Sequence, residues 1–210
     1  MAVPTRTEAL SLLLSTSPSP RLLQHMTVVA EVAAFLAYRT ARAGVPVDRR
    51  LVETAALLHD VDKALPDDHP LKALPHGAAG AAWVTEAGHP ELARTLTAHP
   101  VMHFTDPDIE HWLEDAPLEE RIVTYADKRA TQRVVSLDQR FERWERRHPE
   151  YIAKLEQARI VARRLEDAVC AAAAIEPCEV ERLRWVGDAL DHAVAHGLPG
   201  PDGQAAAWAR

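Results

Sequence analysis

The adjacent pair His59 and Asp60 constrains the fold more than any other feature of the sequence. It closes the apolar segment LVETAALLHDVDK, in which Leu51, Ala55 and Leu58 recur at helical spacing. A helix that buries this face should not end on an imidazole and a carboxylate unless both groups find partners. Adjacent helical residues project about 100° apart, so both can reach one ion only at a helix end. The pair therefore indicates a buried polar site, and a metal ion is one partner that would satisfy it.

The rest of the chain favours an all-α fold. The 210 residues are 47% hydrophobic but only 5% aromatic, and alanine and leucine dominate, without a strand pattern. Helix signals divide the chain: Ser19 with Pro20 starts a long helix that Gly44 ends, and Asp48 caps the next. The predicted helices cover about 7–15, 20–42, 48–60, 76–87, 90–98, 106–116, 117–130, 136–148, 150–174 and 179–197.

Charge and length limit the partners. A net charge of −7 argues against general nucleic-acid binding, but it allows a small anion held by a metal and a few local basic groups. No segment has the length of a membrane span or the flanks of a signal peptide, so we expect a cytoplasmic protein without a membrane partner. Cys170 and Cys178 form neither a disulfide framework nor a CxxC metal motif.

Four further residues are candidate metal ligands. His25 lies on the apolar face of the helix over 20–42, and Asp127, in IVTYADK, shares a face with Val123 one turn earlier. His76 and His99 stand at predicted helix ends. Each also has a simpler explanation. An inward histidine such as His25 can be a hydrogen-bonded core residue, and Asp127 can form a surface salt bridge with Lys128 or Arg129. His76 can simply begin a helix, and His99, before a proline, can close a turn. Their order along the chain separates these alternatives.

The order His25, His59-Asp60, His76-Gly77, His99, Asp127 resembles the HD-domain superfamily of metal-dependent phosphohydrolases over about residues 19–130. The words AALLHDVDKA and YADK are similar to the family's two metal-binding motifs. The HG pair and the second lone histidine resemble small bacterial members with two metals, such as symmetrical diadenosine tetraphosphate hydrolases.

This resemblance implies an HD-domain helical bundle over 19–135. A C-terminal helical extension over 136–197 would then pack on the core or on a partner subunit, which leaves a homodimer possible. The segment 198–210 is rich in Gly, Pro and Ala, and we expect it to be a mobile tail.

The resemblance also implies a ligand set. One metal would be held by His25, His59, Asp60 and Asp127, and Asp60 could bridge to a second metal held by His76 and His99. Imidazole and carboxylate ligands do not distinguish iron, manganese, zinc, nickel and cobalt, so the expectation is one or two divalent ions of open identity. A water on such an ion has a pKa lowered to about 7 and can attack phosphorus.

Residues near this set are candidates for catalysis and substrate binding. Lys63 either clamps a phosphate oxygen or is a solvated charge at a helix C-terminus. Asp62 stands where many relatives have a small residue, and it can act as a general base, orient a histidine or face solvent. The expected catalytic residues are Asp60, Asp62 and Lys63, and the expected substrate-binding residues are Lys63, His103, Arg129 and Arg133.

The expected function is metal-dependent hydrolysis of a phosphoester or phosphoanhydride bond in a small phosphate compound, such as a nucleotide. Two alternatives stay open. Some proteins with a similar six-ligand arrangement are di-iron oxygenases, and a protein that binds a nucleotide without turnover would be a sensor that signals through its C-terminal helices.

Overall fold

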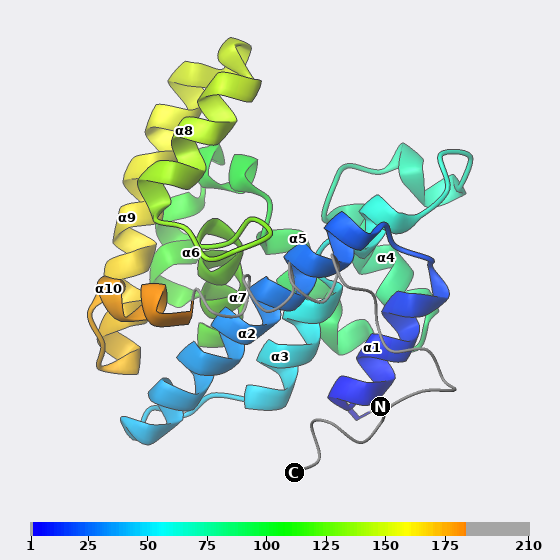
Figure 1. The fold of residues 1–210 in the computed structure, drawn as a ribbon, viewed down its shortest axis with the longest axis horizontal. Helices are drawn as coiled ribbons and strands as arrows, with labels where there is room; N and C mark the ends of the chain where they lie inside the picture. The colour runs from blue at the N-terminus through cyan, green and yellow to red at the C-terminus, as the bar shows by residue number, and fades with distance from the viewer. Residues whose placement is uncertain (1, 184–210) are drawn as a thin grey trace, which may run out of the picture.

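The computed structural model describes residues 2–183, and these residues confirm the all-α fold, with no strand among them (Figure 1). The longer helices are α1 (Arg6–Ser15), α2 (Pro20–Arg42), α3 (Arg49–Leu58), α4 (Ala78–Glu86), α5 (Ala93–Ala98), α6 (Ile109–Asp115), α7 (Leu118–Lys128), α8 (Leu137–Arg147) and α9 (Ile152–Ala173). Short 3₁₀ turns include η1 (Val61–Ala64), η2 (Pro70–Ala73) and η4 (Val101–Thr105), and α10 (Pro177–Val180) and η6 (Glu181–Leu183) end the described chain.

Helix α2 lies at the centre of the bundle and packs against α3, α7 and α9. It begins as its sequence predicts: the Ser19 side chain accepts a hydrogen bond from the Leu22 amide, and Pro20 occupies the first turn. Val28, Val29 and Val32 are fully buried on it. Because α2, α3 and α7 are mutually packed, their ends bring distant parts of the sequence together.

Helices α8 and α9 form an antiparallel pair at one side of the molecule (Figure 1). Helix α9 also packs on α2, α7 and η4. Its buried residues Leu155, Val161 and Leu165 belong to the same continuous apolar core as the residues of α2 and α3. The C-terminal extension therefore shares the core of the bundle.

Several helix ends differ from the sequence-based bounds. Helix α3 stops at Leu58, so His59 is its cap and Asp60 lies in the following turn. Helix α4 starts at Ala78, which leaves His76 on the preceding loop. The predicted helix over 179–197 lies mostly, and the predicted tail over 198–210 entirely, outside the described residues. Among residues 2–183, no helix combines the length and apolarity that a membrane crossing requires.

Candidate metal centre

The six side chains predicted as ligands converge in the structure. His25 comes from the second turn of α2, His59 and Asp60 from the end of α3, and Asp127 from the last turn of α7. His76 precedes α4, and His99 caps α5. Five of them form two groups of closely spaced ligand atoms that share Asp60, and Asp127 lies beside the first group.

The first group joins α2, α3 and α7. The Nε2 atom of His25 lies 3.3 Å from Nε2 of His59, 3.4 Å from Oδ2 of Asp60 and 3.3 Å from Oδ1 of Asp127. The Nε2 atom of His59 lies 3.5 Å from the same oxygen of Asp60 and 3.8 Å from that of Asp127. His25, His59 and Asp60 thus form a compact group, and Asp127 lies beside it, closest to His25.

The second group uses the other oxygen of Asp60. Its Oδ1 atom lies 3.3 Å from Nε2 of His76 and 3.3 Å from Nε2 of His99, and these two nitrogens are 3.1 Å apart. Asp60 is buried, with 2% of its surface exposed. Its contacts show that it turns one carboxylate oxygen toward each group.

The outer nitrogens of the four imidazoles fix their tautomers. Nδ1 of His25 donates to the Thr131 carbonyl at 2.9 Å, and Nδ1 of His76 contacts Oδ2 of Asp62 at 2.8 Å. His59 and His99 each donate from Nδ1 to the carbonyl three residues earlier, at 2.7 Å, because each follows a helix whose last carbonyls lack partners. The Nε2 lone pairs consequently face one another across the site.

Such an arrangement fits a bound cation. The Nε2 lone pairs and the carboxylate oxygens that face one another repel each other unless a proton or a metal ion lies between them. A divalent ion about 2.1 Å from each ligand atom keeps neighbouring ligand atoms about 3.0 to 3.4 Å apart. The separations within both groups are close to this range, so the chemistry and the spacing of the ligand atoms both fit one ion per group.

Without a metal, the two carboxylates of the centre favour protonated histidines. Burial lowers the pKa of His25, but contacts with Asp127 and Asp60 outweigh burial and raise the pKa to about 9. The pKa of His76 is likewise about 9, since Asp60 and Asp62 outweigh its burial. Burial lowers the pKa of His99 to about 4. Metal binding must therefore displace one proton in each group, from His25 in the first and from His76 in the second.

Lys128 is a member of the site that the sequence did not indicate. Its side chain is fully buried, and its Nζ donates to Oδ2 of Asp127 at 2.7 Å and to the His99 carbonyl at 2.6 Å. Lys128 thus ties the carboxylate of one group to the backbone of the other. The alternative of a surface salt bridge for Asp127 is wrong, because the pair is buried. The one available signal was a lysine directly after the aspartate in an apolar helix end.

Lys63 and Asp62 contact the candidate ligands, whereas His103 lies in a neighbouring cavity. The Nζ of Lys63 lies 2.8 Å from both oxygens of Asp60, while its side chain is 49% exposed. Asp62 is buried behind His76 and does not face solvent. His103 contacts Asp106 and stacks edge-on against Trp112; with His76 it lines a cavity of about 380 Å³.

The structure does not bring Arg129 and Arg133 to the site. The guanidinium of Arg129 is buried, where it meets Glu166 and the hydroxyl of Tyr125, because α9 covers this side of α7. Arg133 is exposed and is not among the residues that line the cavity beside the centre. The expectation that these two arginines contribute charge at the mouth of the site is therefore corrected.

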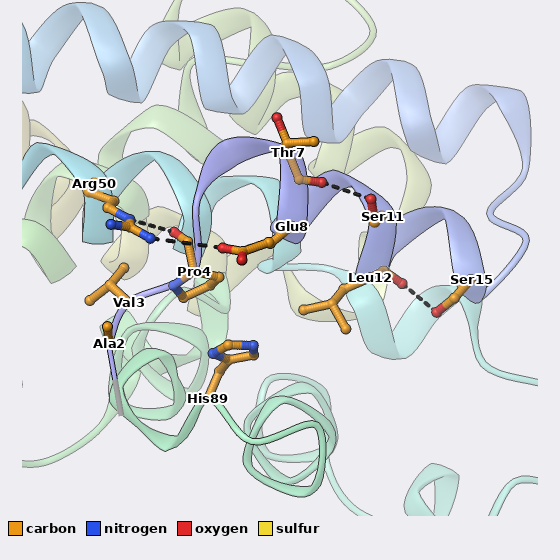
Figure 2. Close-up of a pocket in the computed structure, with 10 residues that line it drawn as sticks. All are labelled: Ala2, Val3, Pro4, Thr7, Glu8, Ser11, Leu12, Ser15, Arg50 and His89. Carbon is orange, nitrogen blue, oxygen red and sulfur yellow. Dashed lines mark hydrogen bonds and ion pairs between the residues drawn. The ribbon is translucent and has the colours of Figure 1, made fainter.

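The cavity beside the metal centre holds about 270 Å³ and is strongly basic. Besides His25 and Asp60, it is lined by Ser19, Arg21, Leu22, Lys63, Thr131, Gln132, Arg140, Arg143, Trp144 and Arg147. Another cavity, of about 550 Å³, lies between the start of α1, Arg50 and His89, and none of the six ligands lines it (Figure 2).

Gly77 controls the position of His76, and replacing it by alanine should loosen the second group. Its φ is +85°, and an added Cβ would lie 2.8 Å from Cγ of Pro100 and 2.9 Å from the Leu96 carbonyl. We expect Gly77→Ala to cost about 1–3 kcal/mol in the free energy of unfolding from backbone strain alone, with a further cost from the clash. Urea unfolding and metal titration would measure both effects.

Gly44→Ala is the matched control for Gly77→Ala. Gly44 has a similar φ of +83°, but nothing lies within 4 Å of an added Cβ. Metal binding should be unchanged in Gly44→Ala and weaker in Gly77→Ala. Equal metal binding by the two variants would contradict a role for Gly77 in positioning His76.

A comparison with known proteins agrees with this geometry. The family model described as "HD domain" matches residues 22–132, which include all six converging ligands. No curated protein and no solved structure gives a significant match.

Proposed function

The chain belongs to the HD-domain family, and from this premise we propose that it is a two-metal hydrolase of a small phosphate compound, such as a nucleotide. One observation carries the proposal: two groups of candidate metal ligands share Asp60, and His25 and Asp60 line a cavity that also has basic side chains. A hydrolase of phosphate esters needs both features, since it must activate water and hold an anion.

In this proposal, His25, His59, Asp60 and Asp127 hold one ion, and Asp60, His76 and His99 hold the other. When bound, the divalent ions lower the pKa of water to about 7 and neutralise the charge that develops on phosphorus. Fe, Mn, Zn, Ni and Co all suit this ligand set.

The chain's own residues supply the remaining functions. Lys63 contacts Asp60, but its side chain is half exposed, so its ammonium group can turn toward a phosphate oxygen of a substrate in the cavity. Lys128 holds the second oxygen of Asp127 and fixes the direction of the first. Asp62 accepts the Nδ1 proton of His76, which supports a positioning role for Asp62 rather than proton transfer to the substrate.

Asp62→Asn tests this positioning role. An amide can still contact His76, but it carries no charge to favour the tautomer with Nδ1 protonated. We expect the affinity of the second metal to fall about 10- to 100-fold, with the first metal little affected. Competition with a coloured chelator measures both affinities. The control is Asp68→Asn, because Asp68 is exposed in the loop that follows. The positioning role requires that the affinity for the second metal fall in Asp62→Asn and stay at the wild-type value in Asp68→Asn.

The experiment that tests the function is a hydrolysis screen on the full-length protein. Protein stripped with EDTA and reloaded with each divalent metal is offered nucleoside mono-, di- and triphosphates, dinucleoside polyphosphates and p-nitrophenyl phosphate. We expect phosphate release that EDTA abolishes and one metal restores. Tight nucleotide binding without turnover would instead favour the sensor, and oxygen uptake by the iron form would favour the oxygenase.

A further inference from the structure

One face of α8 is turned to the metal centre. Arg140, Arg143, Trp144 and Arg147 recur at helical spacing, and all four line the cavity that His25 and Asp60 also line. Helix α8 lies beyond residues 22–132, the part of the chain that matches the family. The C-terminal extension therefore adds its own side chains to the cavity.

This face carries positive charge that acidic residues of α8 do not offset. Asp138 and Glu145 point to the other side, where they pair with Arg163 and Arg159 of α9. Among the residues that line the cavity, Asp60 alone is acidic, and Lys63 already contacts both of its oxygens. In a chain with a net charge of −7, a cavity with this excess of cations is unexpected.

The arginines also act on one another. Burial and then repulsion from Arg21, Arg140, Arg147 and, least, Arg146 lower the pKa of Arg143. The guanidinium of Arg140 stacks on the Trp144 ring at 4.3 Å and contacts Oδ1 of Asp127 at 3.3 Å, while its Nε is buried without a hydrogen-bond partner among the described residues. An anion between these groups would remove the repulsion and would offer acceptors for the guanidinium N–H groups.

The N-terminus of α2 adds to the positive potential of the cavity. Ser19, Arg21 and Leu22 line the cavity, so the positive end of a 23-residue helix dipole faces it together with the arginines. The cavity thus receives cations from α8 on one side and from α2 on another.

We propose that Arg21, Arg143 and Arg147 form a second anion subsite, which holds the phosphates of the substrate beyond the one that reacts at the metal centre. The substrate class is then a compound with a chain of at least two linked phosphates, rather than a phosphomonoester. This assignment rests on the proposed hydrolase for its catalytic meaning, but the subsite can be tested by binding alone.

The binding test uses non-hydrolysable probes on the full-length, metal-loaded protein. Methylenediphosphonate carries two linked phosphonates, and methylphosphonate carries one. Calorimetry on wild type should show tighter binding of the diphosphonate. In the double variant Arg143→Ala/Arg147→Ala, its affinity should fall by at least about tenfold while that of methylphosphonate changes little, because charge-assisted bonds to the second phosphonate are lost.

Arg146→Ala is the matched control. Arg146 lies on the same helix, is exposed, pairs with Glu142 and does not line the cavity. Its removal changes the net charge by one unit without touching the subsite, so diphosphonate binding should stay near the wild-type value. Unchanged diphosphonate binding in the double variant, or an equal loss in Arg146→Ala, would overturn the assignment.

A kinetic arm separates the subsite from the proposed function. The double variant should lose at least about tenfold in kcat/KM for a nucleoside di- or triphosphate and keep its activity on p-nitrophenyl phosphate. Equal losses on both substrates would overturn the subsite. A wild-type protein that hydrolyses nothing with any metal would overturn the proposed hydrolase, while the calorimetry would still decide the subsite.

Discussion

Asp60→Ala is expected to lose both metal ions and to reduce phosphate release by about a thousandfold or more, since the ions supply several kcal/mol of transition-state stabilisation. Asp60 is the residue that turns an oxygen to each ligand group, with contacts of 3.3–3.5 Å to four histidines. Replacing any other ligand removes a contact from one group only. Inductively coupled plasma mass spectrometry measures the metal content of each protein, and initial rates of hydrolysis measure the activity.

The control for this substitution is His111→Ala. The side chain of His111 is 79% exposed and pairs with Asp115 one turn later, so its loss removes a histidine without touching the centre. The folded state of both variants is checked by circular dichroism and urea unfolding. An Asp60→Ala protein that is folded and still holds two ions per chain would show that Asp60 is not the shared ligand.

Glu166→Ala is expected to lower the free energy of unfolding by about 3–5 kcal/mol, because it removes the buried carboxylate partner of the Arg129 guanidinium and leaves only the more exposed Glu181, at 4.0 Å. Glu166 on α9 accepts from Arg129 at 2.9 Å and from the Tyr125 hydroxyl at 2.7 Å, and all three side chains are buried. Urea unfolding measures the change. The result would establish that α9 is an integral part of the fold.

Two comparisons sharpen this stability prediction. Arg164 lies on the solvent face of α9 and pairs with Glu110 of α6, so Arg164→Ala should lower the free energy of unfolding far less than Glu166→Ala does. The double variant Arg129→Met/Glu166→Leu replaces both charges by apolar groups and should recover part of the loss. A Glu166→Ala protein as stable as Arg164→Ala would contradict the buried pair.

The six candidate ligands could be named from the sequence because short motifs in a characteristic order contain them, and the structure brings their side chains together. His59 and His99 also have a local cause, since each caps a helix and donates to a carbonyl three residues earlier. The all-α fold followed from helical spacing and from caps such as Ser19.

The surroundings of the ligands could not be predicted, because they depend on how distant helices pack. Arg129 and Arg133 follow Asp127 closely, yet Arg129 turns into the core once α9 supplies Glu166. Lys128 looked like a surface charge and is fully buried. The arginines of α8 reach the cavity only because α8 and α9 fold back onto the bundle, which no local pattern in the sequence expresses.

The most direct test of the account is anomalous X-ray diffraction from crystals of the full-length protein grown with manganese. We expect two peaks about 3.5–4 Å apart. One should be surrounded by His25, His59, Asp60 and Asp127, and the other by Asp60, His76 and His99. Manganese bound away from both groups, or no bound manganese at saturating concentration, would contradict the two-metal centre on which the proposed function depends.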